Sequence, residues 1–251
     1  MRNPEEYFLE KYSRQIIMEQ VGVEGQKEIN NTSICIIGCG GLGTSAAQYL
    51  SMSGVGKLVF IDHDSIVLSN LNRQTLFTEK DIGESKCKVL TKRIKNINES
   101  ITVNYYQKKI NENNIDQYIK NCSIVLDCTD NFESRLIINK FCHNKKKILV
   151  SAALQNFDIQ AFIFSSWSNK KNPCYKCIFP NLTTSENLSC DEMGIIASVA
   201  GLGGIIQANL ALNYILNLHY NFKELILLDS VKLDIKKIKI EKNKNCEVCC
   251  L

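Results

Sequence analysis

The chain has 251 residues, of which 45% are hydrophobic, and its 30 basic and 26 acidic side chains leave a formal net charge of +4. This length and hydrophobic content suit a single α/β domain with a full core. No arginine cluster interleaved with aromatic residues is present, which argues against a nucleic-acid partner. Six lysines between positions 232 and 244 carry the excess charge, a pattern that fits either a solvated strand edge or a patch for an acidic protein partner.

The chain contains twelve cysteines, but residues 1–15 lack the apolar core of a secretory signal peptide. We therefore expect a reducing, cytoplasmic compartment, where paired cysteines indicate a metal site. Residues 193–218 carry no charge and are long enough to span a bilayer, yet glycines and polar residues divide them into a loop and a helix over about 204–218. We expect that helix to be buried or to form an interface, and we expect no membrane association.

The first predicted elements are amphipathic helices over residues 4–30, which Gly22 and Gly25 interrupt before the first strand. Helices of this kind bury one side and expose the other to solvent. Their apolar face comprises Tyr7, Phe8, Tyr12, Ile16 and Ile17.

Residues 33–64 are predicted to form, in order, a strand, a glycine turn, a helix and a second strand, which an acidic residue follows. The apolar runs 34–37 and 57–61 have strand length, and Asp62 follows the second run. This order is typical of a nucleotide-binding βαβ unit, in which glycines and a helix N-terminus receive a phosphate and the acid suits a ribose hydroxyl. A dinucleotide would also fit this motif. The glycine cluster comprises Gly38, Gly40, Gly41 and Gly43.

A long polar loop, residues 65–86, follows Asp62, and loops of this length in compact α/β units are usually functional. Because binding residues collect beyond the carboxyl ends of parallel strands, we expect Asp62 and Asp130 to face the same crevice as the glycine turn. The further predicted elements in this part are helices at 85–97, 115–119 and 132–144, and strands at 101–106, 124–128 and 148–151.

From residue 154 the pattern changes to strands at 159–164 and 225–228, and residues 229–240 alternate like an antiparallel edge strand. The predicted fold class is therefore α/β, with a Rossmann-like, mostly parallel sheet and a mixed or antiparallel C-terminal part. We expect one domain over residues 1–251, made of N-terminal helices 4–30, a nucleotide-binding core 31–151 and a C-terminal part 152–251.

Charged and amide side chains lie on the long loop and after a later strand. Arg73 and Lys86, near a glycine turn, suit a triphosphate better than a dinucleotide, since the terminal phosphates concentrate negative charge. Asp130 follows a very apolar strand and is a candidate Mg²⁺ ligand. Each of these residues alone is commonly a surface charge or a cap, but together after a nucleotide turn they indicate a binding site. Asn70 and Gln74 belong to the same loop.

Two CxxC pairs, Cys174 with Cys177 and Cys246 with Cys249, can close a tetrahedral thiolate site. Four thiolates leave no coordination position for water, so the predicted metal is structural zinc, which would pin the C-terminal tail to the domain. Buried reduced thiols are the alternative. A redox CxxC is disfavoured because neither pair is expected to open a helix after a strand. The role of Cys250 stays open.

Seven motifs occur in the order found in the MoeB/ThiF/HesA family, and the chain resembles that family from Lys11 to Cys249. These are bacterial E1-like enzymes that adenylate ubiquitin-like sulfur carrier proteins. The resemblance implies a homodimer that binds ATP and Mg²⁺, joins the carrier's C-terminal Gly-Gly to AMP as an acyl-adenylate, and supports thiocarboxylate formation. The motifs are GCGGLG, the D-x-D of Asp62 and Asp64, SNLNRQTLF, GESK, DCTDN, CYKC and CEVC.

The resemblance also implies roles for individual residues. Asp62 should hold the ribose, Arg73 and Lys86 should neutralise the phosphates, and Asp130 should carry Mg²⁺. Arg14 should reach across the dimer into the partner's site. The supporting nucleotide contacts would be Asp64, Asn70 and Gln74, together with the glycines of the turn.

This mechanism needs cations and positioning rather than a nucleophilic side chain, because the carrier's own carboxylate attacks the α-phosphate. The absence of a Ser–His–Asp or Cys–His pattern agrees with it. Cys190 precedes the glycine-rich stretch, where thiamine-type family members carry a cysteine that can link covalently to the carrier; an incidental thiol is the alternative. No rhodanese-like extension follows Cys249, so we expect a separate sulfur donor, either a cysteine desulfurase or a rhodanese-type protein.

Three other functions are alternatives to this assignment. An NAD-dependent oxidoreductase would explain the glycine turn and Asp62 but not Arg73, Lys86 or Asp130. A non-catalytic scaffold should have lost Arg73 or Asp130. A tRNA-modifying relative of the same superfamily is disfavoured by the cysteine pairs. The residues of these motifs match the molybdopterin-type members of the family slightly better than the thiamine-type members. They do not decide between the two biosynthetic pathways.

Overall fold

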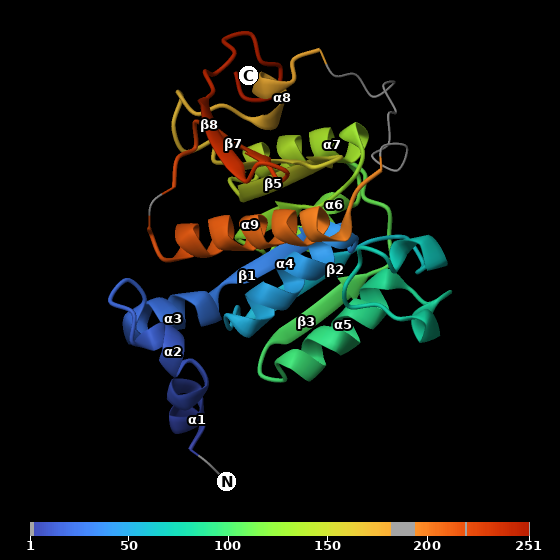
Figure 1. Cartoon of the computed structure of the whole chain (residues 1–251). Coiled ribbons are helices and arrows are strands. Elements are labelled where there is room, and N and C mark those ends of the chain that lie inside the picture. Colours follow the sequence, from blue (N-terminus) through green and yellow to red (C-terminus); the bar gives the residue numbers. More distant parts are fainter. Residues whose placement is uncertain (1–2, 182–193, 219, 251) are drawn as a thin grey trace.

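The computed structural model describes residues 3–181, 194–218 and 220–250. A single eight-stranded sheet, ordered β3-β2-β1-β4-β5-β6-β7-β8, runs through the molecule (Figure 1). The strands from β3 to β5 pair in parallel, and β6, β7 and β8 continue the sheet antiparallel. The predicted fold class is therefore confirmed. The bounds are β1 Ser33–Ile37, β2 Lys57–Ile61, β3 Thr102–Tyr106, β4 Ile124–Asp127, β5 Ile148–Gln155, β6 Asp158–Phe164, β7 Glu224–Asp229 and β8 Asp234–Lys239.

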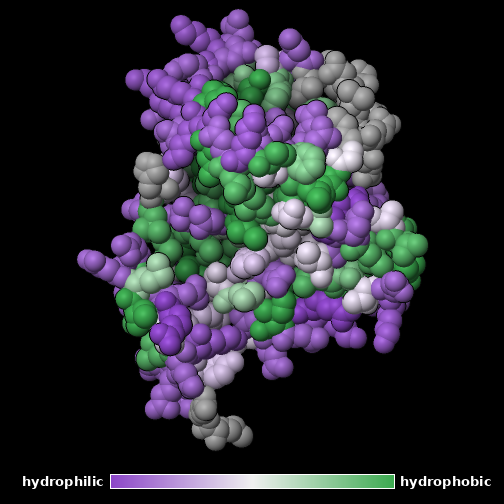
Figure 2. Space-filling view, viewed as in Figure 1, coloured by the Kyte–Doolittle hydropathy of each residue, from purple (hydrophilic) through white to green (hydrophobic). Residues whose placement is uncertain are grey.

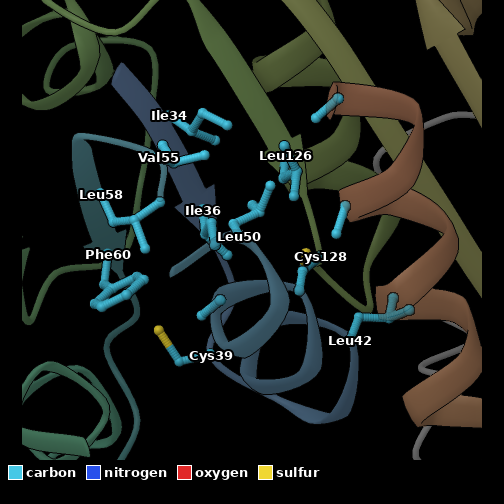
Figure 3. Packing of buried hydrophobic residues seen from close by; sticks show 14 of the residues in the cluster. Ile34, Ile36, Cys39, Leu42, Leu50, Val55, Leu58, Phe60, Leu126 and Cys128 are labelled. Carbon is cyan, nitrogen blue, oxygen red and sulfur yellow. The ribbon is translucent and has the colours of Figure 1, made fainter. Parts of the chain in front are cut away.

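Helices cover both faces of the sheet, and the alternation of side chains along β1 shows why. Ile34 and Ile36 belong to the core under α4, α5 and α9, whereas Cys35 and Ile37 belong to the core under α6 and α7. Figure 3 shows the first core, with side chains of β1 and β2 packed beside those of α4. The bounds are α4 Gly41–Met52, α5 Lys86–Ile97, α6 Ile115–Ile119, α7 Phe132–Asn144, α8 Tyr175–Ile178 and α9 Ala197–Ile215.

Helix α9 begins at Ala197, earlier than the start predicted near residue 204. The glycines that suggested a loop instead allow close packing on α4. A Cβ added at Gly204 would lie 2.3 Å from the Leu42 carbonyl oxygen, and one at Gly203 would lie 2.7 Å from the Leu42 side chain. None of the helices in the described part of the chain combines the length and the hydropathy needed to cross a membrane.

The N-terminal helices α1 (Pro4–Lys11), α2 (Ser13–Ile16) and α3 (Gly22–Asn31) extend to one end of the molecule (Figure 1). Tyr12 anchors them, because its ring is 3% exposed and its hydroxyl accepts a hydrogen bond from Asn98 Nδ2 at 2.9 Å. The rest of the predicted apolar face is more open, with Ile17 72% exposed and Tyr7 45% exposed.

Candidate functional site

The turn between β1 and α4 has a backbone that only glycine suits. Gly38 has φ +94°, and a Cβ there would lie 2.5 Å from the Cys128 carbonyl oxygen. A Cβ at Gly43 would lie 1.9 Å from the Gly38 carbonyl oxygen. No side chain caps the N-terminus of α4 at Gly40, so the first amides of this helix are available to an anion.

This turn forms one wall of a cavity of about 880 Å³ beyond the carboxyl ends of β1, β2 and β4. That volume lies within the range of ligand pockets. Gly43 lies behind the turn and does not line the cavity. The predicted site residues that do line it are Gly38, Gly40, Gly41, Asp62, Asp64, Asn70, Arg73, Gln74, Lys86 and Asp130.

Asp62 follows β2 and is 9% exposed at the cavity wall. Its Oδ2 accepts a hydrogen bond from the Cys39 amide at 2.7 Å, and its Oδ1 accepts one from the Asp64 amide at 2.9 Å. Burial raises the pKa of Asp62, and the Lys86 charge and the two amides offset part of this increase. The carboxylate is thus fixed in orientation, which suits recognition of a ribose hydroxyl.

Lys86 is the first residue of α5 and is a nearly buried cation at the cavity wall. Its side chain is 8% exposed, and Nζ donates to Asp64 Oδ2 at 2.8 Å. Asp64 is 48% exposed and also lies 3.3 Å from His63 Nε2. The ammonium is therefore held at the cavity by an acid that solvent can reach.

The loop between β2 and α5 arranges three more predicted residues. Asn70 is buried in a short 3₁₀ turn (Leu68–Asn70), and its Oδ1 accepts from the Val67 amide at 3.2 Å. Arg73 Nη1 donates to the Ser69 carbonyl oxygen at 2.9 Å. Gln74 is 3% exposed, and the described structure offers its buried Oε1 no hydrogen-bond donor. Asn70, Arg73 and Gln74 all line the cavity, so this loop forms part of its wall.

The loop after β4 contains two acids with different surroundings. Asp127 is 1% exposed, pairs with Arg135 Nη1 at 3.2 Å and accepts from Ser151 Oγ at 2.9 Å. Asp130 is exposed at the cavity and accepts from Asn131 Nδ2 at 3.2 Å. Asp127 therefore fixes the loop, and Asp130 has the position and the hard oxygen donors that suit Mg²⁺.

Sequence reasoning missed three cations that also line the cavity: Lys108, Lys109 and Arg135. Lys109 Nζ lies 3.6 Å from the Glu133 carboxylate. The two lysines follow β3, and the rule that sites collect beyond strand ends could have identified them. Arg135 lies on α7 in an apolar stretch, where a buried cation signals a buried acidic partner.

Besides Gly43, two predicted residues are not placed at this cavity. Arg14 is exposed on α2 and is not among the residues that line it. Cys190 lies outside the described residues.

The four predicted metal ligands lie together, with Sγ–Sγ distances of 3.9 Å for Cys174–Cys177, 3.6 Å for Cys174–Cys246 and 3.5 Å for Cys177–Cys249. A tetrahedron with Zn–S bonds of about 2.3 Å has edges of about 3.8 Å, so the cluster fits zinc. Contact with the Cys174 and Cys177 thiols raises the pKa of Cys249, so four thiolates require a cation. Asn139 Nδ2 lies 3.5 Å from Cys174 Sγ as an outer hydrogen bond.

One premise about the cysteines is wrong, because Cys174 is the N-cap of the short helix α8. The four clustered sulfurs still disfavour redox chemistry, because they fit a metal site. Cys250 Sγ donates to the Asn243 carbonyl oxygen at 3.3 Å and is not part of the cluster.

A Rossmann-like sheet, a glycine turn ringed by cations and acids, and a four-cysteine cluster together define the class of this chain. A profile of the ThiF family matches residues 12–248, and the chain belongs to this family. The family resemblance expected from the motifs is thus confirmed.

Individual relatives narrow the comparison. The chain is 33% identical to the sulfur carrier protein adenylyltransferase of Thermus thermophilus, over 96% of this chain and 90% of that protein. It is 33% identical to the molybdopterin-synthase adenylyltransferase of Salmonella typhimurium, over 95% of each chain. It is also 34% identical to the adenylyltransferase and sulfurtransferase MOCS3 of Xenopus laevis, over 95% of this chain but only 53% of the relative's length.

Solved structures show the same fold. The crystal structure of E. coli MccB with ATP has a TM-score of 0.81 and 23% sequence identity, and the match covers 95% of this chain and 74% of that chain. The crystal structure of PaaA has a TM-score of 0.78 and 19% identity, and covers 96% of this chain and 76% of that chain. At these identities the likeness concerns the fold alone.

Proposed function

We propose that this chain is an ATP-dependent adenylyltransferase that activates the C-terminal Gly-Gly carboxylate of a ubiquitin-like sulfur carrier protein. The observation that carries the proposal is the single cavity that gathers the glycine turn, Asp62, Arg73, Lys86 and Asp130. The named adenylyltransferase relatives, matched over at least 90% of their own length in two cases, support the same reaction class. The cavity cations suit the concentrated charge of a triphosphate better than the pyrophosphate of a dinucleotide.

In the proposed reaction, a carboxylate oxygen of the carrier attacks the α-phosphorus of ATP. The bond between the α-phosphorus and the bridging oxygen breaks, and pyrophosphate leaves with the electron pair, which gives an acyl-adenylate. The protein supplies position and charge: Asp62 orients the ribose, and the amides at the start of α4 receive a phosphate. Asp130 would hold Mg²⁺, which offsets the charge of the triphosphate when bound.

Lys86 is the cation already positioned for the phosphates in this proposal. Before ATP binds, Asp64 holds the ammonium at 2.8 Å, so the cation is already in position and needs no rearrangement. When ATP binds, Lys86 pairs with a phosphate in place of Asp64, and the exposed Asp64 carboxylate is hydrated by solvent. Arg73, Asn70 and Gln74 complete the contacts from the neighbouring loop.

We further propose a homodimer in which Arg14 reaches into the partner's site. Support comes from the open apolar side chains of the N-terminal helices and from α9, which has no charged residue yet keeps many side chains partly exposed. Figure 2 shows hydrophobic side chains gathered over the middle of one face, where Figure 1 draws α9 beside α4. A surface of this kind usually marks an interface.

The C-terminal part would receive the carrier. The β7–β8 hairpin is bordered by lysines and exposes Leu233 and Ile235, at 76% and 58%, which suits an acidic partner with an apolar patch. Zinc in the four-cysteine cluster would hold the tail beside this hairpin. Sulfur would come from a separate donor, a cysteine desulfurase or a rhodanese-type protein, and the many free buried thiols suit a reducing cytoplasm.

ATP–pyrophosphate exchange tests the proposal. The purified chain is incubated with ATP, Mg²⁺ and labelled pyrophosphate, and a molybdopterin-type or a thiamine-type carrier with an intact Gly-Gly end is added in turn. We expect exchange with one carrier and none with a carrier that lacks its last glycine. No exchange with either carrier would refute the assignment. Cys190→Ala is expected to keep exchange, and a loss of thiocarboxylate in that variant alone would support a covalent link to the carrier.

A further inference from the structure

Cys39 and Cys87 form a close pair of thiols directly behind the glycine turn. Cys39 is part of the turn, Cys87 is the second residue of α5, and both side chains are fully buried. Their Sγ atoms lie 3.8 Å apart. Figure 3 shows the Cys39 sulfur below Phe60, on the side away from Leu42. The proposed adenylation uses neither thiol.

Both cysteines form a hydrogen bond with Asp62. The Cys39 amide donates to Asp62 Oδ2 at 2.7 Å, and the Cys87 thiol donates to the Asp62 carbonyl oxygen at 3.3 Å. Their chain neighbours Gly38, Gly40 and Lys86 all line the nucleotide cavity. A change in the separation of the two sulfurs therefore acts directly on the cavity wall and on the acid proposed to hold the ribose.

We infer that Cys39 and Cys87 are a redox-sensitive pair, whose oxidation to a disulfide closes this site to ATP. The inference concerns regulation of the site and rests on the proposed function. A disulfide requires sulfur atoms about 2.0 Å apart, so the pair would have to approach by about 1.8 Å. That shift is large compared with the tolerance of the 2.7 Å hydrogen bond between the Cys39 amide and Asp62. Forming the disulfide therefore disturbs the orientation of the Asp62 carboxylate.

The oxidant in this inference is a peroxide. The Cys87 sulfur attacks one peroxide oxygen and the O–O bond breaks; Cys87 becomes a sulfenic acid, and the released hydroxide leaves as water with the Cys87 thiol proton. The Cys39 sulfur then attacks the Cys87 sulfur, the S–O bond breaks, and the released hydroxide takes up the Cys39 proton as water.

ATP and the disulfide should exclude one another. Gly38, Gly40 and Lys86, which adjoin the two cysteines in the chain, line the cavity that ATP would occupy. Bound ATP would hold Asp62 in the orientation that the disulfide disturbs. By thermodynamic linkage, a disulfide that weakens ATP binding must be disfavoured by ATP to the same extent.

The test exposes the fully reduced, full-length protein to hydrogen peroxide with and without ATP and Mg²⁺. Non-reducing peptide mapping by mass spectrometry detects a Cys39–Cys87 link, and calorimetry measures ATP affinity. We expect the linked peptide only without ATP, and an ATP affinity reduced by about tenfold or more, because a hydrogen bond to a charged carboxylate is disturbed. Dithiothreitol should restore the affinity.

Three variants make the test specific. Cys39→Ala and Cys87→Ala should bind ATP as the reduced protein does and should keep that affinity after peroxide. Cys122→Ala, which changes another buried thiol, should stay sensitive. Absence of the linked peptide, or equal peroxide sensitivity in all three variants, would overturn the inference. Failure of the reduced protein to bind ATP would count against the proposed function alone, since the linked peptide is detected without nucleotide.

Discussion

The Lys86 ammonium lies 2.8 Å from the Asp64 carboxylate, and the two partners differ sharply in exposure, at 8% and 48%. A buried cation needs a partner, because an uncompensated charge in the protein interior is costly. Asp64 is that partner. When an anion binds to Lys86, the exposed Asp64 carboxylate can be hydrated by solvent instead. The relationship explains how a cation can be kept ready for phosphates before any nucleotide binds.

Lys86→Ala should therefore lower kcat/KM for ATP–pyrophosphate exchange by about 100-fold, the usual loss when one preorganised group that stabilises developing charge is removed. Lys86→Arg should recover part of the activity. Lys88→Ala is the matched control, since Lys88 lies on the same helix and forms an exposed pair with Glu84 at 2.7 Å. Equal exchange rates for Lys86→Ala and Lys88→Ala would show that Lys86 does not act at the phosphates.

Asp130→Ala should abolish exchange without loss of fold or zinc, because Asp130 is exposed at the cavity and supports no buried group. Exchange assays over a Mg²⁺ series, with circular dichroism and metal analysis, measure the three properties. Asp116→Ala removes another exposed acid, paired with Lys145, and serves as control. If Asp130→Ala exchanged at the wild-type rate, Mg²⁺ would be held elsewhere.

The raised pKa of Asp62 gives a pH dependence with a definite sign. Burial raises this pKa above 3.8, so the folded protein binds the proton more tightly than the unfolded chain. The contribution of Asp62 to the free energy of unfolding is thus largest at low pH and is lost as the pH rises from 3.8 through the raised value. Asp62→Asn does not titrate, so wild-type stability relative to this variant should fall over that window.

Urea unfolding of both proteins at a series of pH values measures this difference. A stability difference that stayed flat or grew with pH would contradict the assignment of the raised pKa to Asp62. The same variant should bind ATP more weakly at neutral pH, because an amide offers one acceptor oxygen where the carboxylate offers two.

Cys246→Ser should release zinc and lower the melting temperature by about 5 °C or more, because metal binding contributes directly to the free energy of folding. Metal analysis of the purified protein and thermal unfolding measure both effects. Cys250→Ser is the matched control, since the Cys250 thiol contacts the Asn243 carbonyl oxygen and not the four sulfurs. Wild-type protein purified without any bound metal would contradict the zinc site.

A charge reversal on the β7–β8 hairpin should weaken binding of the carrier without affecting binding of ATP. Lys236→Glu combined with Lys237→Glu is expected to reduce kcat/KM for an acidic carrier by about tenfold at low ionic strength, and the effect should shrink as salt is added. Lys140→Glu on α7, 54% exposed, is the control. An equal effect of the control would assign the change to net charge rather than to this surface.

Much of the fold could be predicted because local pattern and tertiary environment agree. Helices α6 and α7 have the predicted bounds, since their apolar spacing meets a continuous core. The start of α9 was misplaced, because Gly203 and Gly204 read locally as a loop and only the contact with Leu42 shows why a helix tolerates them. Strand β5 runs to Gln155 because β6 pairs with it, which the sequence alone does not display.

The candidate site could likewise be predicted only in part. The glycine turn, Asp62, Lys86 and Asp130 lie in motifs near strand ends and could be predicted, whereas Lys108, Lys109 and Arg135, which also line the cavity, were missed. The sequence could not tell the buried Asp127 from the exposed Asp130, because the difference depends on Arg135 and Ser151, which reach the loop from other elements. The approach of Cys39 to Cys87 likewise depends on how α5 packs behind the turn.

The four-cysteine cluster joins positions 72 residues apart in the chain, as in the contact between Cys174 and Cys246. Closing so long a loop costs entropy, and here the loop contains α9 and the last two strands. The sulfurs can therefore meet only after these elements have reached their places. Metal uptake would then be a late event in folding, and retained zinc would mark molecules whose C-terminal half has been completed correctly.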